Sequence, residues 1–171
     1  MQKDEVQKAL DRFRDHVIKQ ARSNLTRMGK NSSKKLYNSI TGDVKAMPNS
    51  IRMEFSMEEY GFYQDQGVSG IKKKYDTPFS YKSKMPPSSK FDKWMVRKGI
   101  APRNEKGQFA TRKGLSYVIA RSIYVNGIKP SLFFTKPFEA AYKKLPNELI
   151  DKFGIEAAKL FMDTITQPKN K

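Results

Sequence analysis

The first 28 residues carry a helical pattern that constrains the fold more than any other part of the sequence. Apolar side chains recur there every three or four positions, and most residues between them are charged. That period places the apolar positions on one face of a long amphipathic helix, and Gly29 follows as a stop signal. We expect this face to be buried. Its residues are Val6, Leu10, Phe13, Val17, Ala21, Leu25 and Met28.

A β-hairpin at about residues 40–57 is predicted next. Alternate positions of 40–47 are apolar or small, and residues 51–57 alternate between apolar and polar, which is typical of half-buried strands. The Pro-Asn-Ser sequence between the two runs has the chemistry of a turn. A short helical turn at about 33–39 is expected to lead into this hairpin.

The remaining predicted elements are helices. They lie at about residues 58–63, after a cap at Ser88 or Ser89, at 115–125, and at 137–165 with an interruption near Leu145 and Pro146. The buried positions predicted for the two middle helices are Phe91, Trp94 and Met95, then Val118, Ile119, Ser122 and Ile123, before a stop at Gly127. A small antiparallel sheet with several helices makes an α+β fold, which residues 1–171 are expected to form as a single domain.

The positive charge is concentrated in one segment. The chain has 34 Lys and Arg side chains against 17 Asp and Glu, a net charge of +17. Residues 72–113 hold 13 of the cations and 3 of the carboxylates, a net +10, and their Pro and Gly content predicts two long loops around one short helix. We interpret this segment as a basic arm inserted in the domain. Its candidate residues for contact with a partner or DNA are Lys72, Lys73, Lys74, Lys82, Lys84, Lys90, Arg97, Arg103, Arg112 and Lys113.

The sequence offers few groups for catalysis. It has no cysteine and one histidine, His16, which the helical pattern places on the surface of the first helix. No GxSxG, GxxxxGK[ST] or GxGxxG motif occurs, so no catalytic, cofactor-binding or metal-binding residue is predicted, and the chain is expected not to be an enzyme. A nuclease-like carboxylate metal site is kept as an alternative, although solvated or capping carboxylates explain the same residues. Its candidates are Glu58, Glu59, Asp65 and Lys72.

The basic arm admits two binding hypotheses. Cations can neutralise phosphates while aromatic rings stack on bases, which favours a nucleic-acid-binding module. They can also dock on an acidic protein, because charge complementarity sets partner and register in assemblies. No helix-turn-helix, zinc-finger or RNP signature is present, which argues against sequence-specific readout. The aromatic candidates are Tyr75, Phe79, Tyr81, Phe91, Trp94 and Phe109.

Neither a membrane-spanning segment nor a secretory signal is expected. No uncharged apolar run approaches the roughly 20 residues that a spanning helix needs. The first residues lack the apolar core of a signal peptide. A chain without cysteine also fits folding in a reducing cytosol, so we expect a soluble protein with no membrane partner.

Two segments resemble a family of bacteriophage proteins. Residues 60–70, YGFYQDQGVSG, look like the YGxFxDxG-type motif of tailed-phage neck proteins, which are head–tail connector or tail-completion proteins. GIKPS at 127–131 and FFTKPF at 133–138 are similar to that family's entry to a C-terminal helix. The N-terminal helix, the hairpin and a basic loop before a Trp-bearing helix follow the same order. The likeness covers roughly residues 5–165 and is to the neck proteins of crAss-like phages in particular. The long segment 72–113 departs from the compact members of the family.

This resemblance implies a structural virion protein. Copies of the chain would form a closed ring, six- or twelve-fold, in the neck between the portal and the tail, assembled in the cytoplasm of the host bacterium. Double-stranded phage DNA would pass through the lumen, and no cofactor is implied. The partners would be other copies, the portal, other neck and tail proteins, and that DNA. The alternative is a free, sequence-nonspecific DNA-binding protein.

The roles implied for the motif residues are structural. Gly61, Gly67 and Gly70 would let the backbone turn sharply where the hairpin passes into the loop. Asp65 either accepts hydrogen bonds from loop amides or is an exposed turn carboxylate. Phe133 and Phe134 either anchor a subunit interface or pack in the core. The full set of candidate interface and turn residues is Tyr60, Gly61, Tyr63, Asp65, Gly67, Phe133 and Phe134.

Overall fold

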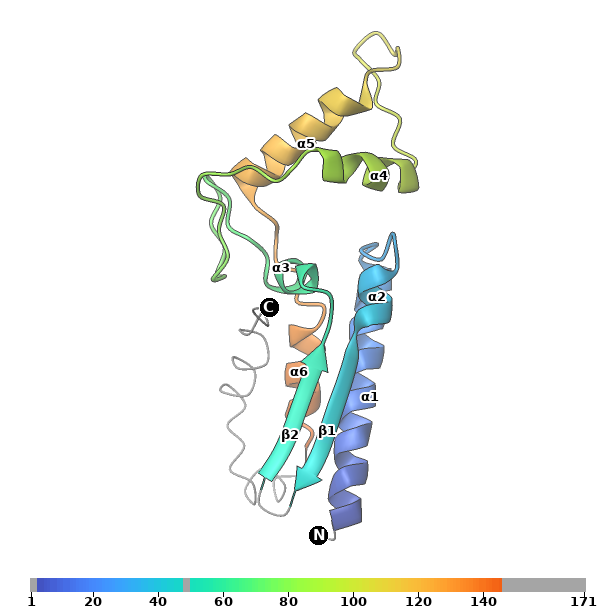
Figure 1. Cartoon of the computed structure of the whole chain (residues 1–171), viewed down its shortest axis with the longest axis vertical. Helices are drawn as coiled ribbons and strands as arrows, with labels where there is room; N and C mark the ends of the chain where they lie inside the picture. Colours follow the sequence, from blue (N-terminus) through green and yellow to red (C-terminus); the bar gives the residue numbers. More distant parts are fainter. Residues whose placement is uncertain (1–2, 48–49, 146–171) are drawn as a thin grey trace. The chain divides into compact units, whose positions relative to one another are not determined.

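The computed structural model describes residues 3–47 and 50–145, and the chain divides into two compact units (Figure 1). Unit 1 combines residues from 1–62 and 132–171, and unit 2 is formed by 63–131. A long N-terminal helix, one small antiparallel sheet and several further helices make up the α+β fold that the sequence predicts.

Helix α1 (Lys3–Arg27) follows the predicted pattern. Six of the seven apolar positions expected on its inner face are buried, from Val6 to Leu25. The prediction is wrong at Met28, which is 39% exposed. The reason is local, because the helix ends one residue earlier and the chain turns away from the buried face there.

The end of α1 has the glycine-terminated geometry that the sequence indicates. Gly29 has a φ of 63°, and its N–H donates to the Thr26 carbonyl oxygen at 3.0 Å. The Lys30 N–H donates to the Leu25 carbonyl oxygen at 2.9 Å, so two of the last carbonyl groups of the helix are satisfied. Burial lowers the pKa of the Lys30 ammonium group, because desolvation disfavours its charged form.

Strands β1 (Thr41–Met47) and β2 (Ser50–Ser56) form the predicted antiparallel hairpin, with Val44 opposite Met53. The short helix α2 (Lys35–Ser39) precedes it, as expected. One face of the hairpin is buried, which confirms the alternation seen in the sequence. The buried side chains are Val44, Ala46, Met53 and Phe55.

The core of unit 1 lies between α1, the hairpin and α6 (Thr135–Tyr142). Four phenylalanine rings meet there, edge to face in every contacting pair but Phe134 and Phe138, which are stacked. The centroids of Phe55 and Phe134 are 5.3 Å apart, and those of Phe13 and Phe138 are 5.5 Å apart. Figure 1 shows α1 and α6 running along the hairpin, so the two helices and the sheet bury a common interior.

The helix predicted at 137–165 is described only up to residue 145, and within that part it already ends at Tyr142. Helix α6 begins at Thr135, and Pro137 lies in its first turn, where its missing N–H would have no helical partner. Residues 146–165 and the interruption predicted near Pro146 lie outside the described residues. Among the helices of the described ranges, none is long and apolar enough to cross a bilayer.

The outer edge of β1 is closed by a side chain of α1. Gln7 Nε2 donates to the Val44 carbonyl oxygen at 2.8 Å, and Gln7 Oε1 accepts from the Ala46 N–H at 2.9 Å. Gln7→Ala leaves this strand donor and acceptor without their partner, so we expect the free energy of unfolding to fall by about 1–2 kcal/mol. Urea denaturation measures the change, and Gln20→Ala on the same helix is the control, expected to stay within about 0.5 kcal/mol. Equal losses in the two variants would contradict the bridge.

Unit 2 is built on helices α4 (Ser89–Arg97) and α5 (Arg112–Asn126), which pack against each other. Met95 of α4 and Ala120 of α5 are fully buried. Phe91 and Trp94, also predicted for the apolar face of α4, are only partly buried. Most of the basic arm therefore surrounds a small two-helix core.

The predicted caps of α4 are wrong. Ser88 has helical φ and ψ angles of −61° and −29° and makes no side-chain cap hydrogen bond, and Ser89 is already inside the helix. A capping side chain needs an extended backbone to reach the first free N–H groups. Thr111 meets this condition at the start of α5, with a ψ of 134°, and its Oγ1 accepts from the Gly114 N–H at 3.4 Å.

The buried face of α5 also differs from the prediction. Ser116 and Ala120 are buried, whereas Val118 and Ser122 are exposed. Apolar residues lie on more than one face of this helix, so their period alone does not select the face that packs on α4. The predicted positions that are partly buried are Ile119 and Ile123.

Candidate interaction surface

The two segments that carry the family resemblance meet in unit 2. The Val68 N–H donates to the Ile128 carbonyl oxygen at 2.9 Å, and the Ile128 N–H donates back to Val68 at 2.8 Å. The Ser131 N–H donates to the Asp65 carbonyl oxygen at 3.0 Å, and the Ser131 hydroxyl donates to that of Gln64. Segments separated by some sixty residues of sequence are thus joined backbone to backbone.

Glycine is required for this close approach. Gly127 has a φ of 73°, and a Cβ there would collide with the Val68 carbonyl oxygen. A Cβ at Gly70 would collide with the backbone on the opposite side of the same contact. Neither position has room for a side chain. We call residues 64–70 together with 125–131 the glycine junction.

The motif residues of unit 2 lie in this junction, except Tyr63, which directly precedes it. Gly67 follows α3 (Tyr60–Gln66) with a φ of 77°, and a Cβ there would meet Pro130. Asp65 is 2% exposed, so it is not an exposed turn carboxylate. The Tyr63 ring meets Phe79 edge to face, with centroids 4.7 Å apart.

The motif residues of unit 1 lie in or beside its core. Gly61 faces Met57, and a Cβ there would collide with the Met57 side chain. Tyr60 is 42% exposed. Phe133 and Phe134 are 0% and 1% exposed and belong to the core cluster, which is the second of the two alternatives drawn from the sequence. They present almost no ring surface to another chain.

Ser69 organises the first loop of the basic arm. Its N–H donates to the Phe79 carbonyl oxygen at 2.8 Å, and its own carbonyl oxygen accepts from the Tyr81 N–H at 2.9 Å. The Ser69 hydroxyl donates to the Tyr75 carbonyl oxygen at 3.2 Å and accepts from the Tyr75 N–H at 3.0 Å. Burial raises the pKa of the Tyr81 phenol, because its charged form is disfavoured there. Residues 71–81 are therefore held against the glycine junction.

The structure exposes every one of the ten candidate basic residues of the arm. Arg112 pairs with Asp92 at 3.1 Å, and Lys74 Nζ donates to the Gly70 carbonyl oxygen at 2.9 Å. The arm has ten more cations than carboxylates, so most of its charge has no carboxylate counterpart within the arm. The exposed residues are Lys72, Lys73, Lys74, Lys82, Lys84, Lys90, Arg97, Arg103, Arg112 and Lys113.

Large apolar side chains of unit 2 are exposed among these cations. Among the described residues, Phe109 is the most exposed of the large apolar side chains, at 73%. Val118 and Tyr117 on α5 are 59% and 51% exposed, and Val96 on α4 is 56% exposed. Single exposed apolar side chains are normal on protein surfaces, so these four make unit 2 a candidate interaction surface only together with the cations around them. The sequence pattern of α5 contains this signal, because its apolar residues exceed what one buried face can hold.

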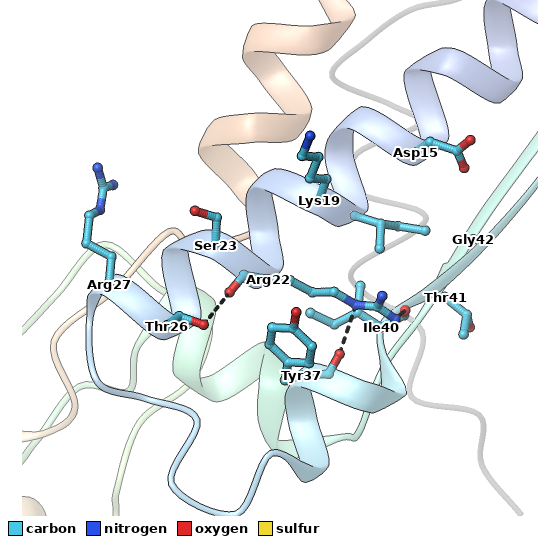
Figure 2. Close-up of a pocket in the computed structure, with 11 residues that line it drawn as sticks. Asp15, Lys19, Arg22, Ser23, Thr26, Arg27, Tyr37, Ile40, Thr41 and Gly42 are labelled. Carbon is cyan, nitrogen blue, oxygen red and sulfur yellow. Dashed lines mark hydrogen bonds between the residues drawn. The ribbon is translucent and has the colours of Figure 1, made fainter.

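A groove of about 850 Å³ lies beside α1 in unit 1 (Figure 2). The Arg22 guanidinium donates to the carbonyl oxygens of Tyr37 and Ile40, each at 3.0 Å, and lies 5.3 Å from the centroid of the Tyr37 ring. Asp15 and Lys19 also line the groove. Arg22 thus ties α1 to the segment that leads into β1, which is a structural use of its charge.

The residues considered for a carboxylate metal site are not gathered by the described structure. Glu58 belongs to unit 1, where it pairs with Lys35 at 3.0 Å. Asp65 and Lys72 belong to unit 2. Over the part of the chain that is described, no three His, Asp or Glu side chains form a cluster suited to a metal ion. His16 is exposed on α1, as predicted.

Comparisons with protein-family models, curated proteins and solved structures find no match to this chain. Three features of the chain bear on its function. They are the two motifs, the glycine junction that they form, and the exposed surface of unit 2. These three features are physically connected, because the junction holds the first loop of the basic arm.

Proposed function

We propose that the chain is a structural virion protein of a tailed phage. It is a ring-forming neck subunit, a head–tail connector or tail-completion protein, that joins the portal to the tail and surrounds the DNA channel. Its copies contact one another in a closed six- or twelve-fold ring and also contact the portal and other neck proteins. In this role the chain catalyses no reaction and uses no cofactor.

The glycine junction is the observation that carries the proposal. The family resemblance depends on segments 60–70 and 127–138, which are far apart in the sequence. Residues 64–70 and 127–131 bond directly through backbone groups, at glycines that tolerate no side chain. Two motifs that meet in this way have a structural reason to occur together in one sequence, because the geometry requires both partners. This supports a relationship to neck proteins through architecture.

The outer face of α5 supplies the apolar surface that a ring subunit needs. Each subunit of a closed ring meets two neighbours through different surfaces, and such contacts bury apolar side chains. Phe133 and Phe134, the anchors considered from the sequence, are enclosed in the core of unit 1. Tyr117 and Val118 are more than half exposed on one helix, and we place them in contact with a neighbouring copy.

Val118→Asp is expected to impair ring assembly without unfolding the chain. A carboxylate in an apolar contact between subunits must be desolvated, so we expect the concentration needed for half-assembly to rise at least about tenfold. The melting temperature of the dilute chain should change little, because Val118 is 59% exposed. Light scattering with negative-stain electron microscopy across a concentration series measures the rings.

Ser33→Asp, which adds the same charge to an exposed site of unit 1, is the control for Val118→Asp. It should assemble like the unmodified chain. If Val118→Asp forms rings at the same concentrations as Ser33→Asp, the outer face of α5 is not a contact between copies. If the unmodified chain forms no ring at any concentration and none is found in virions, the proposed function fails.

A free DNA-binding protein is the second candidate, and the exposed basic arm favours it. The arm carries a net +10, with its cations facing solvent. This alternative predicts tight duplex binding by a monomer, with an affinity that falls steeply with salt because counterions are released. A neck subunit instead forms a ring and is incorporated in virions, so the two candidates differ in their assembly.

A further inference from the structure

The loop between α4 and α5 is exposed from residue 103 to residue 110, and one of its side chains makes three hydrogen bonds within it. We call residues 102–110 the Asn104 loop. Asn104 Oδ1 accepts from the N–H groups of Lys106 and Gln108, at 3.0 and 2.9 Å, and Nδ2 donates to the Gln108 side-chain oxygen at 3.1 Å. Gly107 allows the turn with a φ of 75°. Figure 1 shows this loop extending away from the two helices that it connects.

Two side chains of the Asn104 loop are stacked and presented to solvent. The Arg103 guanidinium lies 4.3 Å from the centroid of the Phe109 ring, which is a cation–π distance. One of its N–H groups donates to the Gly107 carbonyl oxygen at 2.8 Å. A guanidinium has five N–H donors, so others are left for a ligand. The loop therefore holds a planar cation in a defined position before any partner binds.

Further cations flank this position. Lys106 is exposed within the loop, and Arg112 and Lys113 are exposed at the start of α5. Residues 102–113 contain four cations and one carboxylate, and the whole arm carries a net +10. The phosphate backbone of duplex DNA presents one negative charge about every 1.7 Å along its axis, which matches so dense a positive surface. A protein partner would need an equally dense set of carboxylates.

We propose that the Asn104 loop and the first turn of α5 bind the phosphate backbone of duplex DNA without reading its sequence. The amide groups of the loop favour binding without adenine readout. Asn and Gln side chains recognise adenine through an amide oxygen and an amide N–H together. In this loop the oxygens of Asn104 and Gln108 and one N–H of Asn104 Nδ2 are already used in the loop's own hydrogen bonds. Cations that remain exposed contact phosphates, which fix position but carry no sequence information.

The DNA in question is the duplex that passes through the neck, so the identity of this ligand rests on the proposed function. The binding itself is a property of the isolated chain. It can therefore be tested without virions, and ring formation can be tested without DNA. If the chain forms rings but does not bind duplex DNA, the DNA inference fails and the proposed function is unaffected. If it binds DNA but forms no ring, the reverse holds.

The test measures binding of the full chain to a fluorescent duplex of about 30 bp and mixed sequence, by anisotropy across a salt series centred near 0.1 M. The loop variant removes four cations, and the control variant removes two Arg and two Lys from exposed sites of unit 1. The loop variant is Arg103→Gln, Lys106→Gln, Arg112→Gln and Lys113→Gln. The control variant is Arg12→Gln, Lys19→Gln, Arg27→Gln and Lys45→Gln.

We expect the loop variant to bind at least about tenfold more weakly. The magnitude of the slope of log K against log salt should fall by about 3.6, since each of the four phosphate contacts contributes about 0.9. The control should keep its slope, and a second duplex of different sequence should bind equally. Asn104→Ala keeps every charge and should weaken binding without changing the slope. Equal losses in the loop and control variants would overturn the inference. So would binding to polyglutamate with none to duplex, which would indicate an acidic protein partner.

Discussion

Replacing Gly127 with alanine is expected to destabilise unit 2 by at least about 3 kcal/mol, which is a large part of the stability of a typical domain. Two effects add at this position. Gly127 has a φ of 73° and a ψ of −169°, a conformation adopted almost only by glycine, and another residue there costs about 1–3 kcal/mol on its own. The new Cβ would also collide with the Val68 carbonyl oxygen, a backbone atom that cannot rotate away. Pairing of the two motif segments would then be lost.

Gly99→Ala is the matched control for Gly127→Ala. Gly99 also has a positive φ, of 65°, but a Cβ there would meet nothing within 4 Å. Its expected loss is therefore the conformational term alone, about 1 kcal/mol. Urea denaturation measures the free energy of unfolding of both variants. In a separate experiment, limited proteolysis measures how fast residues 72–113 are cut in each. Similar losses for Gly99→Ala and Gly127→Ala would mean that the backbones do not approach as closely as described.

Phe134→Ala is expected to lower the free energy of unfolding of unit 1 by about 3–5 kcal/mol. The ring is 1% exposed and meets Phe55 and Phe138 in the aromatic cluster, so its removal leaves a cavity among rings that cannot collapse into it. The loss should appear in the dilute monomer. An interface anchor would behave differently, because its removal would weaken assembly and leave the monomer as stable as before.

Phe109→Ala is the matched control, since it removes the same side chain from a site that is 73% exposed. It loses a surface contact with Arg103 and should cost no more than about 1 kcal/mol. Thermal and urea denaturation compare the two variants. If Phe134→Ala were as mild as Phe109→Ala, the aromatic cluster would not be the core of unit 1.

The spacing of apolar residues predicts the buried side chains of an element correctly where these residues lie on a single face. Helix α1 has a single apolar face, so its period identifies the buried residues from Val6 to Leu25. The hairpin has a clear alternation and turn. Helix α5 has apolar residues on several faces, and there the same reasoning selects Val118, which is exposed, over Ser116. The face of α5 that is buried is the one that contacts α4, and this tertiary contact is not encoded in the local sequence of α5.

The sequence predicts the charge of the candidate surface but not the backbone pairing and side-chain stacking that shape it. Counting side chains locates the cations of the arm, and all ten named from the sequence are exposed. The pairing of Val68 with Ile128 is not predictable, because no local rule joins segments so distant in sequence. The stacking of Arg103 on Phe109 likewise depends on the turn that Asn104 builds. Composition thus locates the positive charge, and only the geometry shows how the side chains that carry it are held.

The central claim is tested most directly by cryo-electron microscopy of purified virions of a tailed phage whose genome contains this sequence. The account predicts a closed ring of density in the neck, between portal and tail, into which unit 1 and unit 2 each fit as separate bodies around the DNA. Peptides of the chain should be present in the same virions at a copy number equal to the ring symmetry. A complete neck reconstruction whose density is fully explained by other proteins, with this chain absent, would contradict the account.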